Sequence, residues 1–293
     1  MTDALNAAGI RADARRERGM LAALAIPSFL ILGTLLFVPV GWLFFLSIFG
    51  DSGFTLENYT RMVVEPAYAS VFLTTFELSG LVTVLAVFLG YPLSYMIALL
   101  PPRAASVCLT LVLVPFWTAL LVRTYAWLVL LQRRGVVNSL LMNWGVISEP
   151  LALVYNFTGT AIGMLHIMIP FLVLPLYANM RAIDRVYVRA AASLGASPTS
   201  AFWRVYLPLS LPGLAAGTVM VFVICLGFYV TPQFLGGGRV TTISMKIQSN
   251  VATYFDWGAA SALGVALLII TAAVFWAFSR LLPLRRLTEI GDA

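Results

Sequence analysis

Charged side chains are scarce in this chain of 293 residues, since only 10% of them are charged whereas 61% are hydrophobic. A soluble domain carries about 25% charged and about 45–50% apolar residues. The shortage of charge therefore excludes an ordinary water-soluble domain and indicates a protein that lies within a membrane.

Histidine and cysteine are almost absent too, with one histidine and two cysteines in the chain. Cys108 and Cys225 lie in different apolar runs without a Cys-x-x-Cys pair or a Cys/His cluster, so we expect reduced thiols that act as small hydrophobic side chains. His166 lies in another apolar run, where a hydrogen bond inside the protein is expected rather than catalysis. No metal site is predicted.

Motifs for nucleotide binding and hydrolysis are missing as well. The chain has no Gly-x-x-x-x-Gly-Lys-Ser/Thr loop, so it is not expected to bind ATP by that route. It also has no Gly-x-Ser-x-Gly or His-Glu-x-x-His arrangement. We therefore expect a protein that is not an enzyme and that holds no cofactor itself.

Long apolar runs take up most of the sequence. A membrane-spanning helix needs about 20 consecutive apolar residues. Runs of that length lie at about 21–49, 71–100, 105–131, 157–180, 207–230 and 259–283. The first is longer than the roughly 7–15 residues of a signal-peptide core, which favours a retained anchor over a cleaved signal. The sequence predicts an all-α integral membrane protein with six transmembrane helices in one domain, residues 20–283.

The net charge of +6 could indicate a nucleic-acid partner, but its distribution indicates membrane topology instead. If the six spans alternate, one side receives most of the arginines: Arg11, Arg15, Arg16, Arg18, Arg103, Arg181, Arg185, Arg189, Arg204, Arg280, Arg285 and Arg286. Basic residues are retained in the cytoplasm. We therefore expect residues 1–19, the linker 181–206 and the tail 284–293 to be cytoplasmic, and no nucleic-acid partner.

The linker 181–206 has a distinctive pattern of small residues. Ala190–Ala192 would let a helix approach another surface closely, and Gly195 permits a turn that a residue with a Cβ resists. Ser197-Pro198 is typical of the start of a helix, and Leu207-Pro208 follows. The pattern predicts two short helices, joined at Gly195, that could carry a push from a soluble protein into the membrane bundle.

This linker resembles the cytoplasmic coupling loop of ABC-importer permease subunits, whose pattern is Glu-Ala-Ala, three residues, Gly, and a Leu-Pro further on. Ala190-Ala191, Gly195-Ala196 and Leu207-Pro208 match that pattern, whereas Arg189 stands where the family usually has glutamate. The resemblance implies a docking contact with an ATPase subunit. The change of sign leaves two alternatives, an acidic partner on the ATPase or a solvated Arg189.

Further stretches resemble the spermidine/putrescine branch of the type I importer permeases: Tyr91–Tyr95, Pro115–Thr118, Leu121–Trp127, Tyr229–Pro232 and Leu235–Gly237. The resemblance covers nearly the whole chain after residue 20. It implies a second homologous permease, a dimer of ATPase subunits that hold ATP and Mg, and an extracytoplasmic solute-binding protein. It also implies the lipid of a bacterial inner membrane as surroundings.

The implied cargo is a small organic cation, with a polyamine such as spermidine or putrescine first. This branch also resembles permeases for other small organic solutes, so an amino-acid-like or opine-like compound is the alternative. A stand-alone secondary transporter would be expected to show an internal repeat, and no clear repeat is present.

Prolines mark several of the predicted spans, among them Pro92 in the second, Pro115 in the third, and Pro170 and Pro175 in the fourth. A proline inside a spanning helix frees a carbonyl and bends the helix, and a bundle can tolerate this. Two interpretations stay open: ordinary packing or a hinge.

Glu77 is the one acidic residue well inside a predicted span. A charged side chain at the centre of a membrane costs about 2.5–3.5 kcal/mol on insertion scales. Glu77 should therefore contact a cationic solute, or form a structural pair with Arg123 or a tyrosine hydroxyl. Both alternatives remain open.

Aromatic residues surround Arg123 in the third run. Such residues near a membrane surface usually form an interfacial belt, which is the expectation for Trp127, but they can also stack on a cation in a translocation path. The same argument makes two aromatic residues near the outer end of the fifth run candidates for a gate. The substrate-path candidates are Glu77, Trp117, Arg123, Tyr125, Phe228 and Tyr229.

Overall fold

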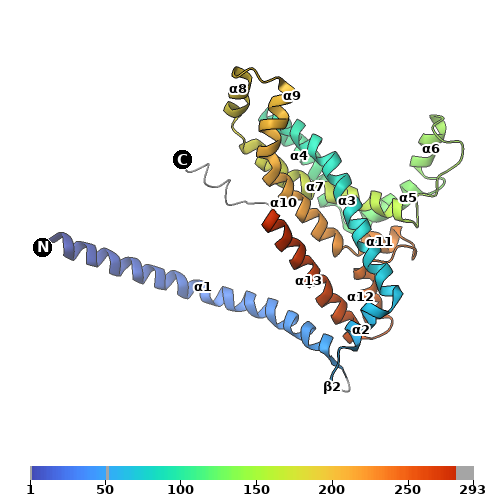
Figure 1. Cartoon of the computed structure of the whole chain (residues 1–293), viewed down its shortest axis with the longest axis horizontal. Coiled ribbons are helices and arrows are strands. Elements are labelled where there is room, and N and C mark those ends of the chain that lie inside the picture. Colours follow the sequence, from blue (N-terminus) through green and yellow to red (C-terminus); the bar gives the residue numbers. More distant parts are fainter. Residues whose placement is uncertain (1, 51–52, 282–293) are drawn as a thin grey trace.

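A computed structural model describes residues 2–50 and 53–281, with side chains described for Met20 and from Ala25 onward. The predicted tail 284–293 lies outside the described residues. The elements, in chain order (Figure 1), are α1 (Thr2–Ile48), β1 (Phe49–Gly50), β2 (Gly53–Phe54), α2 (Glu57–Val64), α3 (Pro66–Leu99), α4 (Pro102–Leu113), the 3₁₀ turn η1 (Val114–Trp117), α5 (Leu120–Leu131), α6 (Val136–Asn143), α7 (Phe157–Ala182), α8 (Arg185–Ser193), α9 (Pro198–Ala201), the π-helical turn η2 (Phe202–Tyr206), α10 (Leu207–Leu226), α11 (Val230–Leu235), α12 (Ile243–Ala252) and α13 (Trp257–Leu281).

The prediction of an all-α membrane fold is confirmed. Within residues 2–50 and 53–281, five helical segments are long and apolar enough to cross a membrane: Ala25–Ile48, Pro66–Leu99, Phe157–Ala182, Pro198–Leu226 and Trp257–Arg280. A sixth span is present there as a bent pair, Pro102–Trp117 followed by Leu120–Asn143, whose axes meet at 96°. The strands β1 and β2 pair antiparallel as a short hairpin between α1 and α2.

The run 105–131, expected to form one spanning helix that Pro115 could bend, is broken into separate helical segments. The chain leaves the helical conformation at Thr118 and Ala119, where ψ is 144° and 139°. Pro115 lies in η1, just after α4 ends and just before this break. A proline disrupts an α-helix because it lacks an N–H and its ring clashes with the preceding turn. Pro92, by contrast, lies inside the continuous helix α3, so proline alone does not decide where a span breaks.

The packed core of the bundle is the junction of α3, α7 and α10. Leu172 of α7 is fully buried between a glycine of α3 and a glycine of α10. A Cβ on Gly90 would lie 2.5 Å from Leu172 Cδ2, and a Cβ on Gly217 would lie 2.9 Å from Leu172 Cδ1 and 3.0 Å from the Leu172 carbonyl oxygen. Small residues at these positions therefore allow the three helices to approach closely.

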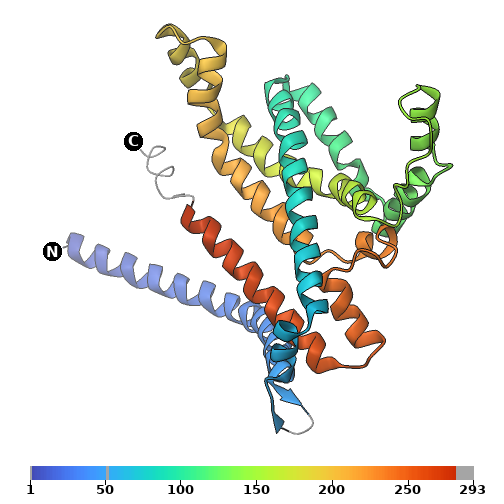
Figure 2. The ribbon, with the colours of Figure 1, turned by 45° about the vertical axis from the view of Figure 1, so that its right-hand side comes forward.

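The helix α1 lies apart from this core. Its main contacts are with α13 near the β1–β2 hairpin, and the two helices diverge from there (Figures 1 and 2). An 18-residue apolar window within Ala25–Ile48 has no buried residue, whereas half of the corresponding window of α7 is buried. An apolar helix with so little cover within its own chain is surrounded by lipid or by another subunit.

Candidate functional site

The predicted pair of short helices in the linker 181–206 is present as α8 and α9, at the end of the molecule (Figure 1). The Asp184 carboxylate caps α8 by accepting the backbone N–H of Val186 at 2.8 Å. Gly195 ends it in the left-handed region, with φ 87°, and donates its N–H to the Ala192 carbonyl at 2.9 Å. The Ser197 hydroxyl then caps α9. The local shape is thus fixed by caps and one glycine.

The linker leaves its small residues and several large apolar side chains uncovered. Arg189, Ala190, Gly195 and Pro208 are exposed, while Ala191, Ala196 and Leu207 are half-buried. Around them the exposed apolar side chains are Val186, Tyr187, Leu194 and Trp203, with Leu194 at 89% exposure. Large apolar side chains gathered on one exposed linker are typical of a contact with another protein. The small-residue pattern of the linker does not predict these four residues.

Arg189 has no ion-pair partner among the described residues, where both ion pairs involve Arg61. Its guanidinium is therefore solvated in the isolated chain. An acidic partner would have to come from another subunit.

A cluster of four aromatic rings connects the linker with α3. Phe202 of η2 lies 6.3 Å from Tyr91 and 5.3 Å from Tyr95 between ring centroids, and Tyr206 lies 5.0 Å from Tyr95. The Tyr91 hydroxyl also forms a hydrogen bond of 2.9 Å with the Ser210 hydroxyl of α10. π-helical turns such as η2 often mark functional sites. The signal that could have revealed the cluster is the spacing of four between Tyr91 and Tyr95 and between Phe202 and Tyr206.

Glu77 lies on the exposed side of α3. No hydrogen bond or ion pair joins it to Arg123 or to a tyrosine within the described part of the chain. The neighbouring Thr75 is buried and accepts the backbone N–H of Ile243 at 2.9 Å, which ties α12 to α3. Thr75 is therefore structural, while the Glu77 carboxylate is left for a partner outside the chain.

Arg123 is half-buried on α5, and its Nε and Nη1 atoms are buried without a hydrogen-bond partner. The guanidinium carbon lies 5.8 Å from the centroid of the Phe116 ring. Trp117 is 78% exposed and Tyr125 is 63% exposed, so both project from the bent segment to its surface.

The indole N–H of Trp127 is satisfied inside the protein. Its Nε1 donates to His166 Nδ1 at 3.1 Å, and both residues are half-buried. The belt expectation for Trp127 stays a prediction. The same contact confirms the expectation that His166 makes an internal hydrogen bond.

The two candidate gate residues lie where α10 gives way to α11. Phe228 packs against the core of α3, α7 and α10, and Tyr229 is half-buried immediately before α11. Thr231 of α11 lies 3.3 Å from Thr124 of α5 between hydroxyl oxygens. The structure thus brings the gate candidates close to the segment that carries Arg123, whereas no hydrogen bond or ion pair among the described residues joins Glu77 to either.

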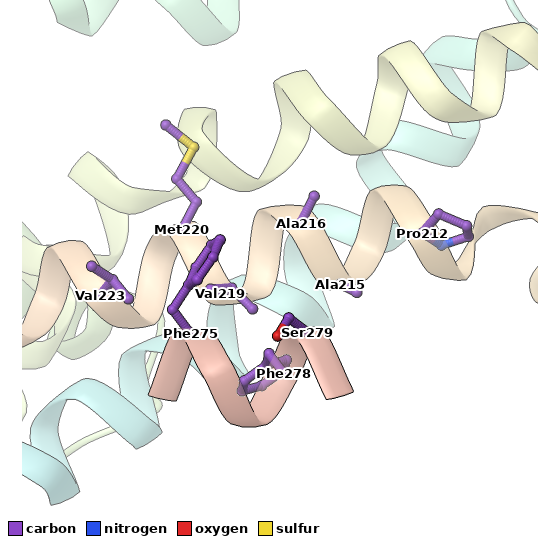
Figure 3. Close-up of a pocket in the computed structure, with 9 residues that line it drawn as sticks. All are labelled: Pro212, Ala215, Ala216, Val219, Met220, Val223, Phe275, Phe278 and Ser279. Carbon is purple, nitrogen blue, oxygen red and sulfur yellow. The ribbon is translucent and has the colours of Figure 1, made fainter. Parts of the chain in front are cut away.

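An apolar cavity lies between α10 and α13 (Figure 3) and has a volume of about 410 Å³. Its walls come from Pro212, Ala215, Ala216, Val219, Met220, Val223, Phe275, Phe278 and Ser279. None of the substrate-path candidates lines it. An almost wholly apolar cavity cannot compensate the desolvation of an ammonium group, so it is not a site for a cationic solute.

Comparisons with known proteins reveal close relatives. No family model matches the chain. It is 34% identical over 232 residues to the spermidine/putrescine transport system permease protein PotB of Escherichia coli K12, covering 78% of this chain and 84% of that protein. PotB of Haemophilus influenzae is 32% identical over 226 residues, covering 77% and 79%.

Among solved structures, a bacterial alginate ABC transporter in complex with an alginate pentasaccharide-bound periplasmic protein contains a chain of similar fold. The TM-score is 0.76 at 16% identity, covering 90% of this chain and 94% of the other. At this identity the likeness concerns the fold alone.

Proposed function

The chain belongs to the permease subunits of ABC importers and is not itself catalytic, and we propose that it forms half of the pathway by which a polyamine enters a bacterial cell. The observation that carries the proposal is the 34% identity with the spermidine/putrescine permease PotB over 78% of the chain.

The proposed assembly contains a second homologous permease, a dimer of ATPase subunits that hold ATP and Mg, and an extracytoplasmic binding protein, in the lipid of the inner membrane with both termini cytoplasmic. The exposed spanning window of α1 and the exposed Trp117 and Tyr125 support an apolar partner in the membrane. The exposed α8–α9 pair supports a soluble partner on the cytoplasmic side.

In the proposed mechanism, the ATPase pushes on α8 and α9 when ATP binding closes its dimer. The movement passes through Phe202 and Tyr206 to Tyr95 of α3, and through Tyr91 to Ser210 of α10. Because α3, α7 and α10 are closely packed, they move as one body and open the path between the two permeases alternately to each side.

The cargo chemistry is supported by Glu77, an exposed carboxylate on a spanning helix with no ionic partner among the described residues. Away from bulk water, a carboxylate–ammonium contact is stronger than at a protein surface. A site that must release its cargo still needs only modest affinity. Glu77 is therefore proposed to contact an ammonium group in transit.

A second candidate cargo is an amino-acid-like or opine-like compound. The observation that favours it is the guanidinium of Arg123, whose buried Nε and Nη1 lack acceptors. A carboxylate can accept two parallel N–H groups from arginine. Spermidine and putrescine carry no carboxylate, so under the polyamine proposal the acceptor for Arg123 comes from the partner permease.

The test is uptake by the reconstituted transporter in proteoliposomes supplied with ATP. Labelled putrescine and spermidine should accumulate, and an excess of unlabelled polyamine should suppress uptake, whereas an excess of amino acids should not. Accumulation of a carboxylate-bearing solute with no polyamine uptake would contradict the polyamine proposal and favour an amino-acid-like or opine-like cargo.

A further inference from the structure

A second cavity lies at the cytoplasmic end of the bundle, between the ends of α3 and α7 and the first turns of α8. It has a volume of about 450 Å³. Its polar walls are Tyr95, Arg181, Arg185, Arg189 and Tyr206. None of the substrate-path candidates lines it, and it is separate from the apolar cavity of Figure 3.

The three arginines make this cavity strongly positive. Arg181 Nη1 donates to the carbonyl oxygens of Ala98 at 3.2 Å and Leu100 at 3.5 Å, which holds the guanidinium at the end of α3. Arg185 and Arg189 lie one helical turn apart on α8, and neither forms an ion pair within the described part of the chain.

The nearby carboxylate does not neutralise this charge. Asp184 lines an adjoining, more open hollow rather than the cavity itself. One of its oxygens already accepts the backbone N–H of Val186 as the cap of α8. The cavity is therefore lined by three arginines and by no acidic residue.

The position of the cavity matches the level of lipid headgroups. Arg181 lies in the last turn of the spanning helix α7, and the spanning helix α3 ends at Leu99, which also lines the cavity. The remaining walls, including Ile183 and Val188, are apolar. A free phosphate ion would gain nothing from an apolar wall, whereas a lipid has a phosphate and a glycerol-ester region with acyl chains.

We propose that this cavity binds the phosphate headgroup of an anionic membrane lipid, held by Arg185 and Arg189 with Arg181 at its base. Guanidinium groups bind phosphate oxygens through paired N–H donors, and basic pockets at the cytoplasmic side of spanning helices suit anionic headgroups. The lipid would fill the space between α8 and the ends of α3 and α7, so that the coupling helix rests on it. The inference does not depend on the identity of the transported solute.

The test uses the assembled transporter in nanodiscs of phosphatidylcholine with an increasing fraction of phosphatidylglycerol, and measures retained phosphatidylglycerol by mass spectrometry after purification. Arg185→Ser should raise the fraction needed for half-saturation roughly five-fold, as expected for one basic contact with an anionic lipid. Arg185→Lys should restore part of the binding, because it keeps the charge but loses the paired donors. Arg103→Ser is the matched control, since Arg103 is an exposed arginine of the neighbouring α4 that does not line the cavity.

Several results would overturn the inference. Equal phosphatidylglycerol titrations for Arg185→Ser and the wild type would show that Arg185 does not bind the lipid. An equal weakening of lipid binding by Arg103→Ser would show that only the general surface charge matters. Displacement of the lipid by millimolar inorganic phosphate would identify a free anion as the ligand. Loss of the ATPase subunit in Arg185→Ser, with an unchanged lipid titration, would make the cavity a docking site for an ATPase carboxylate.

Discussion

The packed junction of α3, α7 and α10 and the coupling end formed by α8 and α9 use small residues for opposite purposes. In the junction, Gly217 is required by space, because a Cβ there would meet Leu172. At the coupling end, Gly195 has no neighbour within 4 Å of the position of a Cβ and is required by its positive φ. This difference indicates that the small residues of the junction serve packing between helices of the same chain. Those of the coupling end are available for a contact with another molecule.

The largest effect is expected at the coupling end, from Gly195→Pro. Proline fixes φ near −65° and removes the N–H that Gly195 donates to Ala192, so the turn between α8 and α9 cannot form. Uptake should fall to background while the spans remain folded. The measurements are solute uptake and the thermal unfolding of the purified protein.

Gly195→Asn is the matched variant, because asparagine tolerates the left-handed conformation better than other residues with a Cβ. It should keep most of the uptake. Normal uptake by Gly195→Pro would show that the shape of this turn does not matter.

The next effect should appear in the junction, from Gly217→Ala. The added methyl group would press on the side chain and backbone of Leu172, and overpacking of this kind costs about 1–3 kcal/mol. A lower unfolding temperature is expected. The control is Gly80→Ala in α3, where a Cβ meets nothing within 4 Å. Equal unfolding temperatures for the two variants would contradict the close packing of α7 and α10.

A smaller effect is expected from Glu77→Gln, which tests whether the exposed carboxylate of α3 contacts the transported solute. The variant should lower polyamine uptake several-fold, since loss of one favourable charge contact worth about 1 kcal/mol corresponds to roughly five-fold. Assembly with the ATPase should persist. Wild-type uptake rates across a range of polyamine concentrations would make Glu77 unrelated to the path.

The smallest effect is expected from Arg61→Ala in α2. The Arg61 guanidinium lies 3.3 Å from a Glu65 oxygen and 3.8 Å from an Asp256 oxygen, and the hydrogen bond with Glu65 raises the pKa of Arg61. The side chains are 40–46% exposed, and such pairs contribute about 0–1 kcal/mol. A loss of more than about 2 kcal/mol in the free energy of unfolding would contradict this, because the ion pair of Arg61 with Asp256 would then be essential for holding α2 against the start of α13.

The parts of the fold that depend on local properties could be predicted from the sequence. Apolar length predicted six spans, of which five are continuous helices in the described part of the chain, and the turn at Gly195 follows from the conformation that this one residue permits. The break near Pro115 could not be distinguished from the continuous helix around Pro92, because both residues are prolines within long apolar runs. The surrounding packing decides which proline is tolerated.

The candidate site was less predictable because its contacts join distant residues. Trp127 and His166 are 39 positions apart, and each could have satisfied its polar atoms elsewhere. The lack of acceptors for Arg123 is likewise a property of the assembled fold. The roles of Glu77 and Arg123 stay predictions, since the atoms that would contact them belong to other molecules.

In the proposed mechanism, the exposed small-residue face of α8 contacts the ATPase and carries its movement into the helical bundle. The most direct test is solute-stimulated ATP hydrolysis by the reconstituted transporter with Ala190→Trp. Ala190 is exposed, so the indole would meet the partner rather than the chain itself. We predict that stimulation by solute and binding protein is lost in this variant while the permease keeps its unfolding temperature. Stimulation equal to that of the wild type would contradict the claim.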